Sequence, residues 1–374
     1  MILPAINRLT VANTLYNEGV TEKPFKSSIT LRDVAARAGV NATTVSVVLN
    51  GNRSGTRVSA ATRERILSVA SELGYSPNMA ARGMKSRRMN SIGVVDIMHA
   101  KGLNLYFLEV LNGILEKAAE REQNTTVFTL SNWETEEDKI LQFCDGRVDG
   151  LIFVGPQFRA EFAQTLFRRT PFVALHSNIP LPVSTTLEID DEQGGYLATN
   201  YLTELGHRRI AHLAGPEHFS GANQRIKGYL RALEEAGIVY DASLVMTGEF
   251  DAPSGRERAE RILDNGALRP TALFCANDQI AFGAMEVLAE RGVPVPSAMS
   301  VVGFDDSLTA RMTNPPLTTI CQPFRQLGQH AVELLLDQIG NNAVNKPVSS
   351  EETTVIREIF PVELVVRGST SARS

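Results

Sequence analysis

Hydrophobic positions follow two different patterns along the chain. Between residues 30 and 75 they recur at spacings of three and four, which predicts three short helices and no strand. From Ser91 onward, short apolar runs alternate with stretches of helical period. The predicted strands are 92–97, 125–130, 149–155, 171–177, 185–190, 209–215, 245–250, 271–277 and 299–305, and the predicted helices are 106–121, 135–144, 194–205, 223–236, 254–265 and 278–291.

Alternating strands and helices predict an α/β fold in which right-handed crossovers wind parallel sheets. A second strand–helix series begins near Gly194, so we expect two similar doubly wound subdomains. The expected organisation is a flexible tail (1–29), a helix-turn-helix domain (30–75), a hinge (76–90), a ligand-binding and dimerisation body (91–368) and a second tail (369–374). The first subdomain is expected at about 91–190 and 320–345, the second at about 191–319 and 346–368.

The first of the three short helices has clear end signals. Thr30 and Asp33 have the spacing of a capping box, and Gly39 permits a tight turn. Asn41 is placed to cap the second helix. In that helix the period turns Thr44, Val45, Val48 and Leu49 inward and leaves Ala42, Thr43, Ser46 and Val47 on the outer face. A third helix is expected from Ser59 to Gly74.

Two short helices joined by a glycine turn are typical of a helix-turn-helix motif. Small outward side chains let the second helix enter the major groove of DNA. There Thr43 and Ser46 can bond base edges or phosphates, and Ala42 and Val47 can touch thymine methyl groups. The alternative is a small helical bundle with no nucleic-acid role.

Composition separates this basic segment from the rest of the chain. The 374 residues carry a net charge of −5, but residues 30–90 contain ten Lys or Arg and three Asp or Glu. This asymmetry favours a polyanion-binding head on an acidic body; a solvated basic surface is the alternative. Three scattered cysteines indicate neither a disulfide framework nor a zinc site and suit a reducing cytoplasm. No apolar run reaches the roughly 18 residues of a membrane span, and the first residues are a poor secretory signal.

Specific motifs lie along most of the chain. The segments TLRDVAARAGVNATTVSVVLNG and RVSAATRERILSVASELGYSPNMAARGM are followed by VDGLI, ELGHRRIAHLAGP, NQRIKGYLRAL, ANDQIAFGAMEVL, VPSAMSVVGFDD, PPLTTICQP and ELVVRGST. In sequence and order they resemble the lactose/galactose repressor (LacI/GalR) family of bacterial transcription regulators, over about 340 residues. The resemblance implies a three-helix DNA-binding head, a hinge, and two parallel-sheet subdomains of periplasmic-binding-protein type.

For the head and hinge, the resemblance implies a set of DNA contacts. The hinge would fold when two copies meet over the minor groove, where Met84 would wedge between base pairs in the place where the family usually has leucine. Val47 replaces a usual arginine, so no operator sequence is inferred. A plain linker is the alternative for the hinge. The implied contacts are Thr30, Asn41, Ala42, Thr43, Thr44, Ser46, Val47, Asn50, Arg57, Asn78, Ala81, Met84 and Lys85.

Polar residues recur where predicted strands of the body end. In open α/β sheets, ligands bind beyond the carboxyl ends of the strands. Carboxylates, an amide, a guanidinium and aromatic rings together suit a sugar, a sugar acid or a nucleobase. The alternative is that Asn277, Asp278 and Asp306 simply cap helices. The strand-end residues are Asp96, Asp190, Asn277, Asp278, Asp305 and Asp306, with Arg225, Tyr106 and Phe107 nearby.

The resemblance implies that Arg225, Asn277 and Asp305 contact the effector. It also implies aromatic contacts from Tyr106 and Phe107, and a weaker match at Asp190. His176-Ser177 stands where many relatives have an acidic residue, often followed by arginine, so the ligand's identity stays open between a sugar-like molecule and a nucleobase.

Enzyme signatures are absent from the sequence. We find no nucleophile elbow, phosphate-binding loop or dinucleotide fingerprint, and no catalytic residue, cofactor or metal is expected. The spacing of His207, His212 and His218 near Glu217 does not suit one metal ion. The leading hypothesis is a cytoplasmic, nucleoid-associated transcription regulator, more specifically a repressor. An exported solute-binding protein and a sugar-converting enzyme are the competing hypotheses.

A homodimer on a near-palindromic operator is expected because one short recognition helix reads too few base pairs for useful affinity. The family also contains tetramers with an additional C-terminal leucine-heptad helix. Here the chain ends at RGSTSARS after the last predicted strand, which favours a dimer. The sequence leaves open whether the effector releases DNA or promotes its binding.

Overall fold

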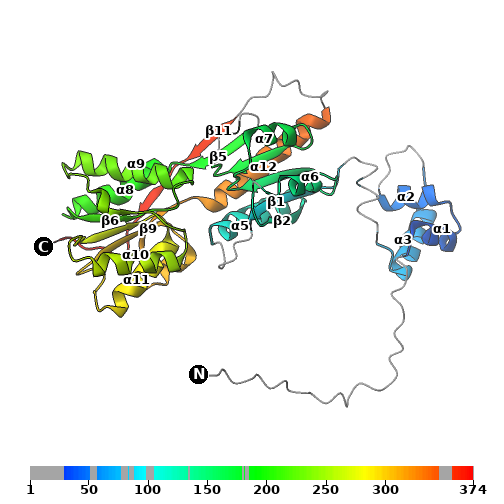
Figure 1. Cartoon of the computed structure of the whole chain (residues 1–374). Coiled ribbons are helices and arrows are strands. Elements are labelled where there is room, and N and C mark those ends of the chain that lie inside the picture. The colour runs from blue at the N-terminus through cyan, green and yellow to red at the C-terminus, as the bar shows by residue number, and fades with distance from the viewer. Residues whose placement is uncertain are drawn as a thin grey trace, which may run out of the picture. The chain divides into compact units, whose positions relative to one another are not determined.

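The computed structural model describes residues 29–50, 57–76, 83, 88–97, 105–133, 135–178, 181, 185–344 and 356–373. The chain separates into two compact units, Met1–Ser86 and Arg87–Ser374 (Figure 1). The smaller unit contains the helix-turn-helix segment, called the head below. The larger unit contains two α/β lobes, called the body. We describe each unit separately.

The described part of the head consists of α1 (Leu31–Ala38), α2 (Ala42–Asn50) and α3 (Ala60–Leu73). Thr30 and Asp33 form the predicted capping box, with the Thr30 N–H donating to Asp33 Oδ2 over 2.8 Å. Asn41 Oδ1 accepts the Thr44 N–H at 2.7 Å. The helices enclose a small core formed by Val34, Ala35, Ala38, Val45, Val48, Ile66, Val69 and Ala70. The predicted three-helix head is therefore confirmed.

The first lobe of the body contains a six-stranded parallel sheet. Its strand order is β11-β5-β4-β3-β1-β2, which is the interleaved order that crossover helices produce. The elements are β1 (Ser91–Ile97), α5 (Leu105–Glu120), β2 (Asn124–Leu130), α6 (Glu137–Phe143), β3 (Gly150–Val154), α7 (Ala160–Phe167), β4 (Phe172–Leu175), β5 (Thr185–Ile189), α12 (Phe324–Val344) and β11 (Arg357–Phe360).

The second lobe repeats this architecture with the order β12-β10-β9-β8-β6-β7, in which only β12 runs antiparallel to its neighbour. Helices α8 and α9 cover one face of the sheet, and α10 and α11 cover the other (Figure 1). The elements are α8 (Asp191–Glu204), β6 (Ile210–Leu213), α9 (Ser220–Glu235), 3₁₀ helix η1 (Ala242–Leu244), β7 (Val245–Met246), α10 (Ala252–Asp264), β8 (Ala272–Cys275), α11 (Asp278–Glu290), β9 (Ser300–Asp305), 3₁₀ helix η2 (Leu308–Arg311), β10 (Thr318–Cys321) and β12 (Glu363–Val365).

Three helix pairs pack with their backbones in direct contact at glycines. Each of the pairs α5–α12, α8–α9 and α10–α11 has one glycine on either helix. A Cβ atom at any of these positions would collide with a backbone carbonyl of the partner helix. The pairs are thus held at a separation that no larger residue permits. The glycines are Gly113 and Gly328, Gly195 and Gly228, and Gly255 and Gly283.

The predicted fold class is confirmed, but the last part of the chain differs from expectation. In the described residues the chain passes between the lobes three times: after β5, after β10 and after β11. Residues 346–368 were expected in the second subdomain, yet β11 pairs in parallel with β5 of the first sheet. The change of lobe falls at Pro361–Val362 because β12 then joins β10. Helices α7 and α12 and strands β10, β11 and β12 were not predicted individually.

The expected tail at 369–374 is instead packed on the second lobe over its described residues. Ser369 is fully buried, accepts the Thr318 N–H at 2.8 Å and donates to the Val301 carbonyl at 2.6 Å. Further along, the Arg373 N–H donates to the Leu205 carbonyl. Polarity suggested a free tail, but these small polar side chains satisfy backbone groups of buried strands. No helix in the described residues combines the length and apolar character needed to cross a bilayer.

Arg258 is the largest fully buried side chain and holds together the loops of the second lobe. Its guanidinium donates to the carbonyls of Ala214, Met246 (3.1 Å) and Glu249 (3.0 Å), and its Nε–H donates to Ser254 (2.9 Å). Burial lowers the pKa of this arginine. Its charge is therefore held by carbonyl dipoles of the loops that follow β6 and β7.

We expect Arg258→Met to lower the free energy of unfolding by about 3 kcal/mol, because several buried carbonyls lose their donors together. Urea denaturation of the full-length protein measures this change. The matched control is Arg256→Met on the same helix, which pairs with Glu260, Glu286 and Glu290 at the solvent-exposed surface; it should cost at most about 1 kcal/mol. Equal losses for both variants would contradict this role for Arg258.

Candidate functional site

The outer face of α2 in the head is only partly as predicted. Thr43 is exposed, whereas Ser46 and Ala42 are half-buried, and Ala42 packs against the head core. Val47 was expected on the outer face but is 7% exposed, so this placement is wrong. The helical period identifies only the face of α2 turned toward α1 and α3. Val47 is not part of the cluster that these helices form.

The other predicted DNA contacts divide into described and undescribed positions. Thr30, Asn41 and Arg57 are exposed. Thr44 is half-buried, and its hydroxyl donates to Asn41 Oδ1 at 2.8 Å. The exposed basic side chains of the head include Arg32, Arg57, Arg63 and Arg65, while Arg37 pairs with Glu72 at 3.2 Å. The hinge positions Asn78, Ala81, Met84 and Lys85 and the side chain of Asn50 lie outside the described residues.

In the body, a buried ion pair organises the ends of the second-lobe strands. Arg225 on α9 donates from Nε to Asp191 Oδ1 at 2.8 Å, and its Nη1 donates to the Ala276 carbonyl after β8. The guanidinium lies 3.8 Å from the centre of the Phe304 ring at the end of β9. Arg225 and Asp191 are both nearly inaccessible to water. One side chain therefore links the start of α8 with the ends of β8 and β9.

The first lobe contributes an aromatic pair opposite these groups. Tyr106, at the start of α5, shares a hydrogen bond of 2.5 Å with His176 Nδ1, after β4. Both rings pack edge-on against Phe324. Burial, followed by the charges of Asp96, Asp191 and Asp305, raises the pKa of Tyr106, and Arg225 opposes this shift. Groups of both lobes therefore act on one phenol. We call Asp96, Tyr106, His176, Asp191, Arg225 and Asp305 the strand-end cluster.

His176 is neutral in this setting. Burial lowers the pKa of its imidazole to about 4, and its Nε2 is buried without a hydrogen-bond partner in the described structure. Its backbone has a φ of +49°, an uncommon conformation for a residue with a side chain. Strain and an unsatisfied buried polar atom concentrate at binding sites, so His176 joins the candidate residues.

Two carboxyl groups of the cluster favour their protonated form. Burial raises the pKa of Asp96 to about 7. Burial together with the nearby Asp278 raises that of Asp305. Asp305 Oδ1 also accepts from Gln322 Nε2 at 2.7 Å, while Gln322 Oε1 is buried without a partner in the described structure. The cluster and the neighbouring Gln322 thus present carboxyl and amide groups rather than a free cation.

Several predicted strand-end residues also have structural partners. Asn277 caps α11 by accepting the Ile280 N–H, and its amide donates to the Phe250 carbonyl. Asp278 accepts from Ser307 and Thr319, and Asp306 pairs with Arg367. Asp190 caps α8 by accepting the Gln193 N–H at 3.0 Å. Of the six predicted effector contacts, Tyr106, Arg225 and Asp305 belong to the strand-end cluster, in which the charges of Arg225 and Asp305 act on the Tyr106 phenol.

Sequence reasoning missed Asp191, His176 and Gln322 as members or neighbours of this site. Asp191 directly follows the predicted strand-end residue Asp190, and Gln322 directly follows β10, a strand that the pattern did not single out. His176 was noticed only as a departure from the family. Phe107 is half-buried and packs on the main core of the body.

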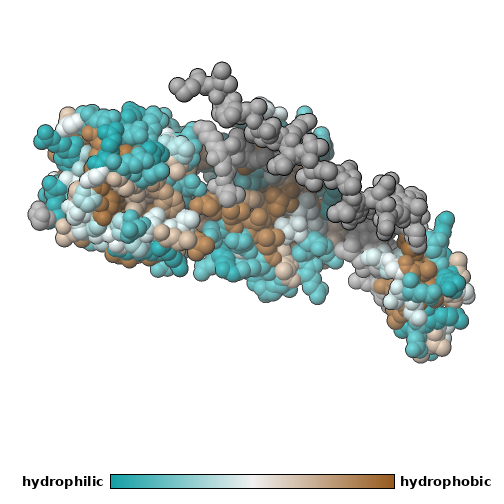
Figure 2. Space-filling view, turned by 90° about the horizontal axis from the view of Figure 1, so that it is seen from below, coloured by the Kyte–Doolittle hydropathy of each residue, from teal (hydrophilic) through white to brown (hydrophobic). Residues whose placement is uncertain are grey.

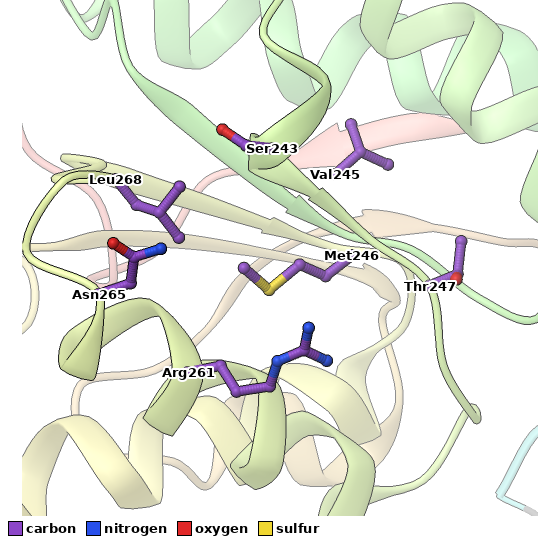
Figure 3. A pocket seen from close by; sticks show the side chains of 7 residues that line it. All are labelled: Ser243, Val245, Met246, Thr247, Arg261, Asn265 and Leu268. Carbon is purple, nitrogen blue, oxygen red and sulfur yellow. The ribbon is translucent and has the colours of Figure 1, made fainter.

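Other possible sites have a different character. A surface pocket of about 410 Å³ lies beside edge strand β7 and includes none of the strand-end cluster (Figure 3). Arg261 is its only ionisable lining residue.

The histidines that were considered as metal ligands have other partners. His207 bonds Thr271 and Ser300, and His212 stacks on Phe274. Within the described residues, no three histidine, cysteine or acidic side chains are grouped to hold a metal ion.

Comparison with known proteins supplies independent information. A family model described as "Bacterial regulatory proteins, lacI family" matches residues 30–78, and one described as "Periplasmic binding protein-like domain" matches 199–370. The chain is 37% identical over 330 residues to the repressor PurR of Vibrio atlanticus, covering 85% of this chain and 94% of that protein. It is 33% identical to the regulator DegA of Bacillus subtilis, covering 91% and 98%.

Solved structures agree with this result. A lac repressor dimer bound to operator and an anti-inducer has 32% identity and a TM-score of 0.78, covering 92% of this chain and all of that one. A complex of the regulator CelR with cellobiose has 31% identity and a TM-score of 0.66, covering 91% and 99%.

A helix-turn-helix head joined to a two-lobed body with polar strand ends defines the class of ligand-controlled transcription regulators. Within that class, the chain belongs to the LacI family of bacterial regulatory proteins. Members of this family are DNA-binding transcriptional repressors whose activity effector ligands control.

The raised pKa of Asp96 predicts a pH-dependent effect of its replacement. In the unfolded chain the carboxyl titrates near pH 4, whereas in the folded protein it titrates near 7. The stability linked to its proton is complete below pH 4 and is lost as the pH rises through 7. We expect Asp96→Asn, which resembles the protonated form, to match the wild type near pH 4 and to be about 4 kcal/mol more stable at pH 8, because a shift of about three pKa units corresponds to about 4 kcal/mol.

Urea denaturation at several pH values measures this difference. Asp138→Asn, at an exposed position of the same lobe, is the control for removal of a surface carboxylate and should change the free energy of unfolding by at most about 0.5 kcal/mol. If the stability of Asp96→Asn relative to the wild type did not change with pH, the buried carboxyl would titrate as it does in water.

Proposed function

We propose that this protein is a dimeric transcriptional repressor that binds a near-palindromic operator and changes its operator affinity when a sugar-like effector occupies the strand-end cluster. The observation that carries the proposal is the joining of a basic three-helix head to that cluster in one chain. The similarity to a lac repressor dimer on its operator supports the same conclusion.

Reading of DNA is assigned to the outer face of α2, where Thr43 is exposed and Ser46 is half-buried. Thr43 and Ser46 would contact base edges or phosphates, and the exposed arginines around them would bind the phosphate backbone. Phosphate contacts supply most of the affinity, while base contacts choose the site. The hinge residues Met84 and Lys85 would complete the contact in the minor groove.

The polar groups of the cluster favour an uncharged ligand rich in hydroxyl groups. The charge of Arg225 is already balanced by Asp191, so an anion would find no unpaired cation there. Gln322 Oε1 and His176 Nε2 are buried polar atoms that a hydroxyl could satisfy. Solved relatives include one with cellobiose and one with ribose, and PurR repressors are relatives in sequence. A nucleobase is therefore the second candidate.

Dimerisation would use the first lobe. Leu108 and Leu115 of α5 and Val127 of edge strand β2 are large apolar side chains exposed to solvent, and Figure 2 shows hydrophobic surface on this lobe. Exposed apolar surface of this kind indicates a contact surface. A second copy would bury it and would bring two heads to the two half-sites of an operator.

Control of DNA affinity would follow from a change in lobe closure. A ligand shifts a conformational equilibrium only by its difference in affinity for the two states. Groups from both lobes act on Tyr106, so a ligand bound there would favour one lobe arrangement. We assign the protein to the cytoplasm and give it no catalytic role. An exported solute-binding protein, the competing assignment for the body, would have no use for the DNA-binding head.

The head assignment predicts that Thr43→Ala combined with Ser46→Ala lowers affinity for the preferred genomic fragments about tenfold or more. Binding to unrelated DNA should change little, because phosphate contacts remain. Sequencing of genomic fragments bound at physiological salt, followed by anisotropy titration, measures both affinities. Glu64→Ala on α3 is the control at an exposed site. A wild-type protein without any sequence preference would contradict the proposed function.

The effector assignment predicts that a neutral sugar raises the melting temperature of the full-length protein in a screen of sugars, sugar phosphates and nucleobases. Asp305→Asn should weaken binding of that ligand about tenfold or more, because a hydrogen bond to the cluster is lost or misdirected. Asp264→Asn, exposed in the same lobe, should bind as the wild type does. A ligand bound equally by both variants would place the site elsewhere.

A further inference from the structure

Helix α9, which carries Arg225, does not receive a side-chain cap from its own N-cap residue. That residue is Phe219, whose side chain cannot accept a hydrogen bond. By contrast, α8, α10 and α11 of the same lobe are capped by their own residues Asp190, Asp251 and Asn277. The first amides of a helix have no partner within it, so those of α9 pair either with water or with an acceptor from another segment.

That acceptor comes from the other lobe. The Ser220 N–H, at the first residue of α9, donates to Asn178 Oδ1 at 3.2 Å. Asn178 lies in the loop after β4, two residues beyond His176, and its own N–H donates to the Pro156 carbonyl at 3.2 Å. The loop is therefore fixed on the first lobe while its side chain reaches the second.

We propose that Asn178 is a positioning residue that caps α9 across the two lobes and so stabilises their closed arrangement around Arg225. The proposal rests on the proposed function, since it describes how the same site is controlled. When the lobes separate, Ser220 exchanges a protein acceptor for water. The hydrogen bond therefore contributes to closure and not merely to the stability of one lobe.

The Asn178–Ser220 hydrogen bond affects the strand-end cluster because Ser220 lies close to Arg225 on the same helix. Ser220 precedes Arg225 by five residues, less than two helical turns, so fixing the first turn limits how far the guanidinium can move. On the opposite side, the loop that carries Asn178 also carries His176, the partner of Tyr106. One cross-lobe hydrogen bond thus joins the two segments that hold the two halves of the cluster.

The bond is exposed to solvent, so its strength should be that of an ordinary surface helix cap, about fivefold in an equilibrium constant. Asn178→Leu removes the acceptor at similar size. Asn178→Asp keeps an acceptor at the same length, and Asn178→Ala is a second removal variant if the leucine perturbs folding. The matched control is Asn223→Leu, also in the first turn of α9, whose amide donates to Glu217 of its own lobe at 2.7 Å.

Hydrogen exchange of the full-length protein without ligand measures the exchange rate of the Ser220 amide directly. We expect exchange to be about fivefold faster in Asn178→Leu and Asn178→Ala, and unchanged in Asn178→Asp and Asn223→Leu. Unchanged exchange in both removal variants would overturn the proposal. Equally fast exchange in Asn178→Asp would also overturn it, because the acceptor would then not be the cause.

A second readout tests the link to closure. With any sugar found by the thermal screen, Asn178→Leu should bind about fivefold more weakly, while Asn178→Asp and Asn223→Leu bind as the wild type does. Faster exchange with unchanged sugar affinity would overturn the coupling and leave only a local cap. The exchange experiment needs no ligand, so it distinguishes failure of this inference from failure of the proposed function.

Discussion

The charge on Arg225 has to be balanced inside the protein, and much of the candidate site follows from the way this is done. Water hardly reaches the guanidinium, which is held by Asp191, by the Ala276 carbonyl and by the face of Phe304. A buried charge is tolerated only when it is paired and hydrogen-bonded. These contacts fix three strand or helix ends of the second lobe relative to one another, so the site is already formed before any ligand arrives.

The side of the strand-end cluster that the first lobe contributes carries little charge, which complements the balanced charge of Arg225. The imidazole of His176 is uncharged, and the carboxyl of Asp96 holds its proton up to about neutral pH, both because of burial. A ligand approaching from water therefore meets hydrogen-bonding groups without an excess positive charge. Such a surface discriminates by the number and direction of hydroxyl groups more than by charge.

Local signals in the sequence predicted local structure well. The caps at Thr30, Asn41 and Ser59 set the helices of the head, because a cap depends on residues three or four positions apart. The alternating pattern predicted the α/β class, the rule for strand ends found Asp305, and the family resemblance pointed to Arg225 nearby. Prediction from the sequence failed where segments far apart in the chain meet, because no local period reveals such partners. The examples are the pairing of β11 with β5, the burial of Ser369 and Val47, and the contact of Tyr106 with His176.

The glycine contacts between helices limit how the body can deform. In each of the three pairs, backbone meets backbone without an intervening side chain, so there is no layer of rotamers through which the two helices could slide. Each helix pair should then move as one rigid body. Rotation of one lobe relative to the other must therefore occur at the three short connecting segments at Asp190, at Gln322–Pro323 and at Pro361–Val362. The backbone torsion angles of these few residues determine how far the lobes can rotate.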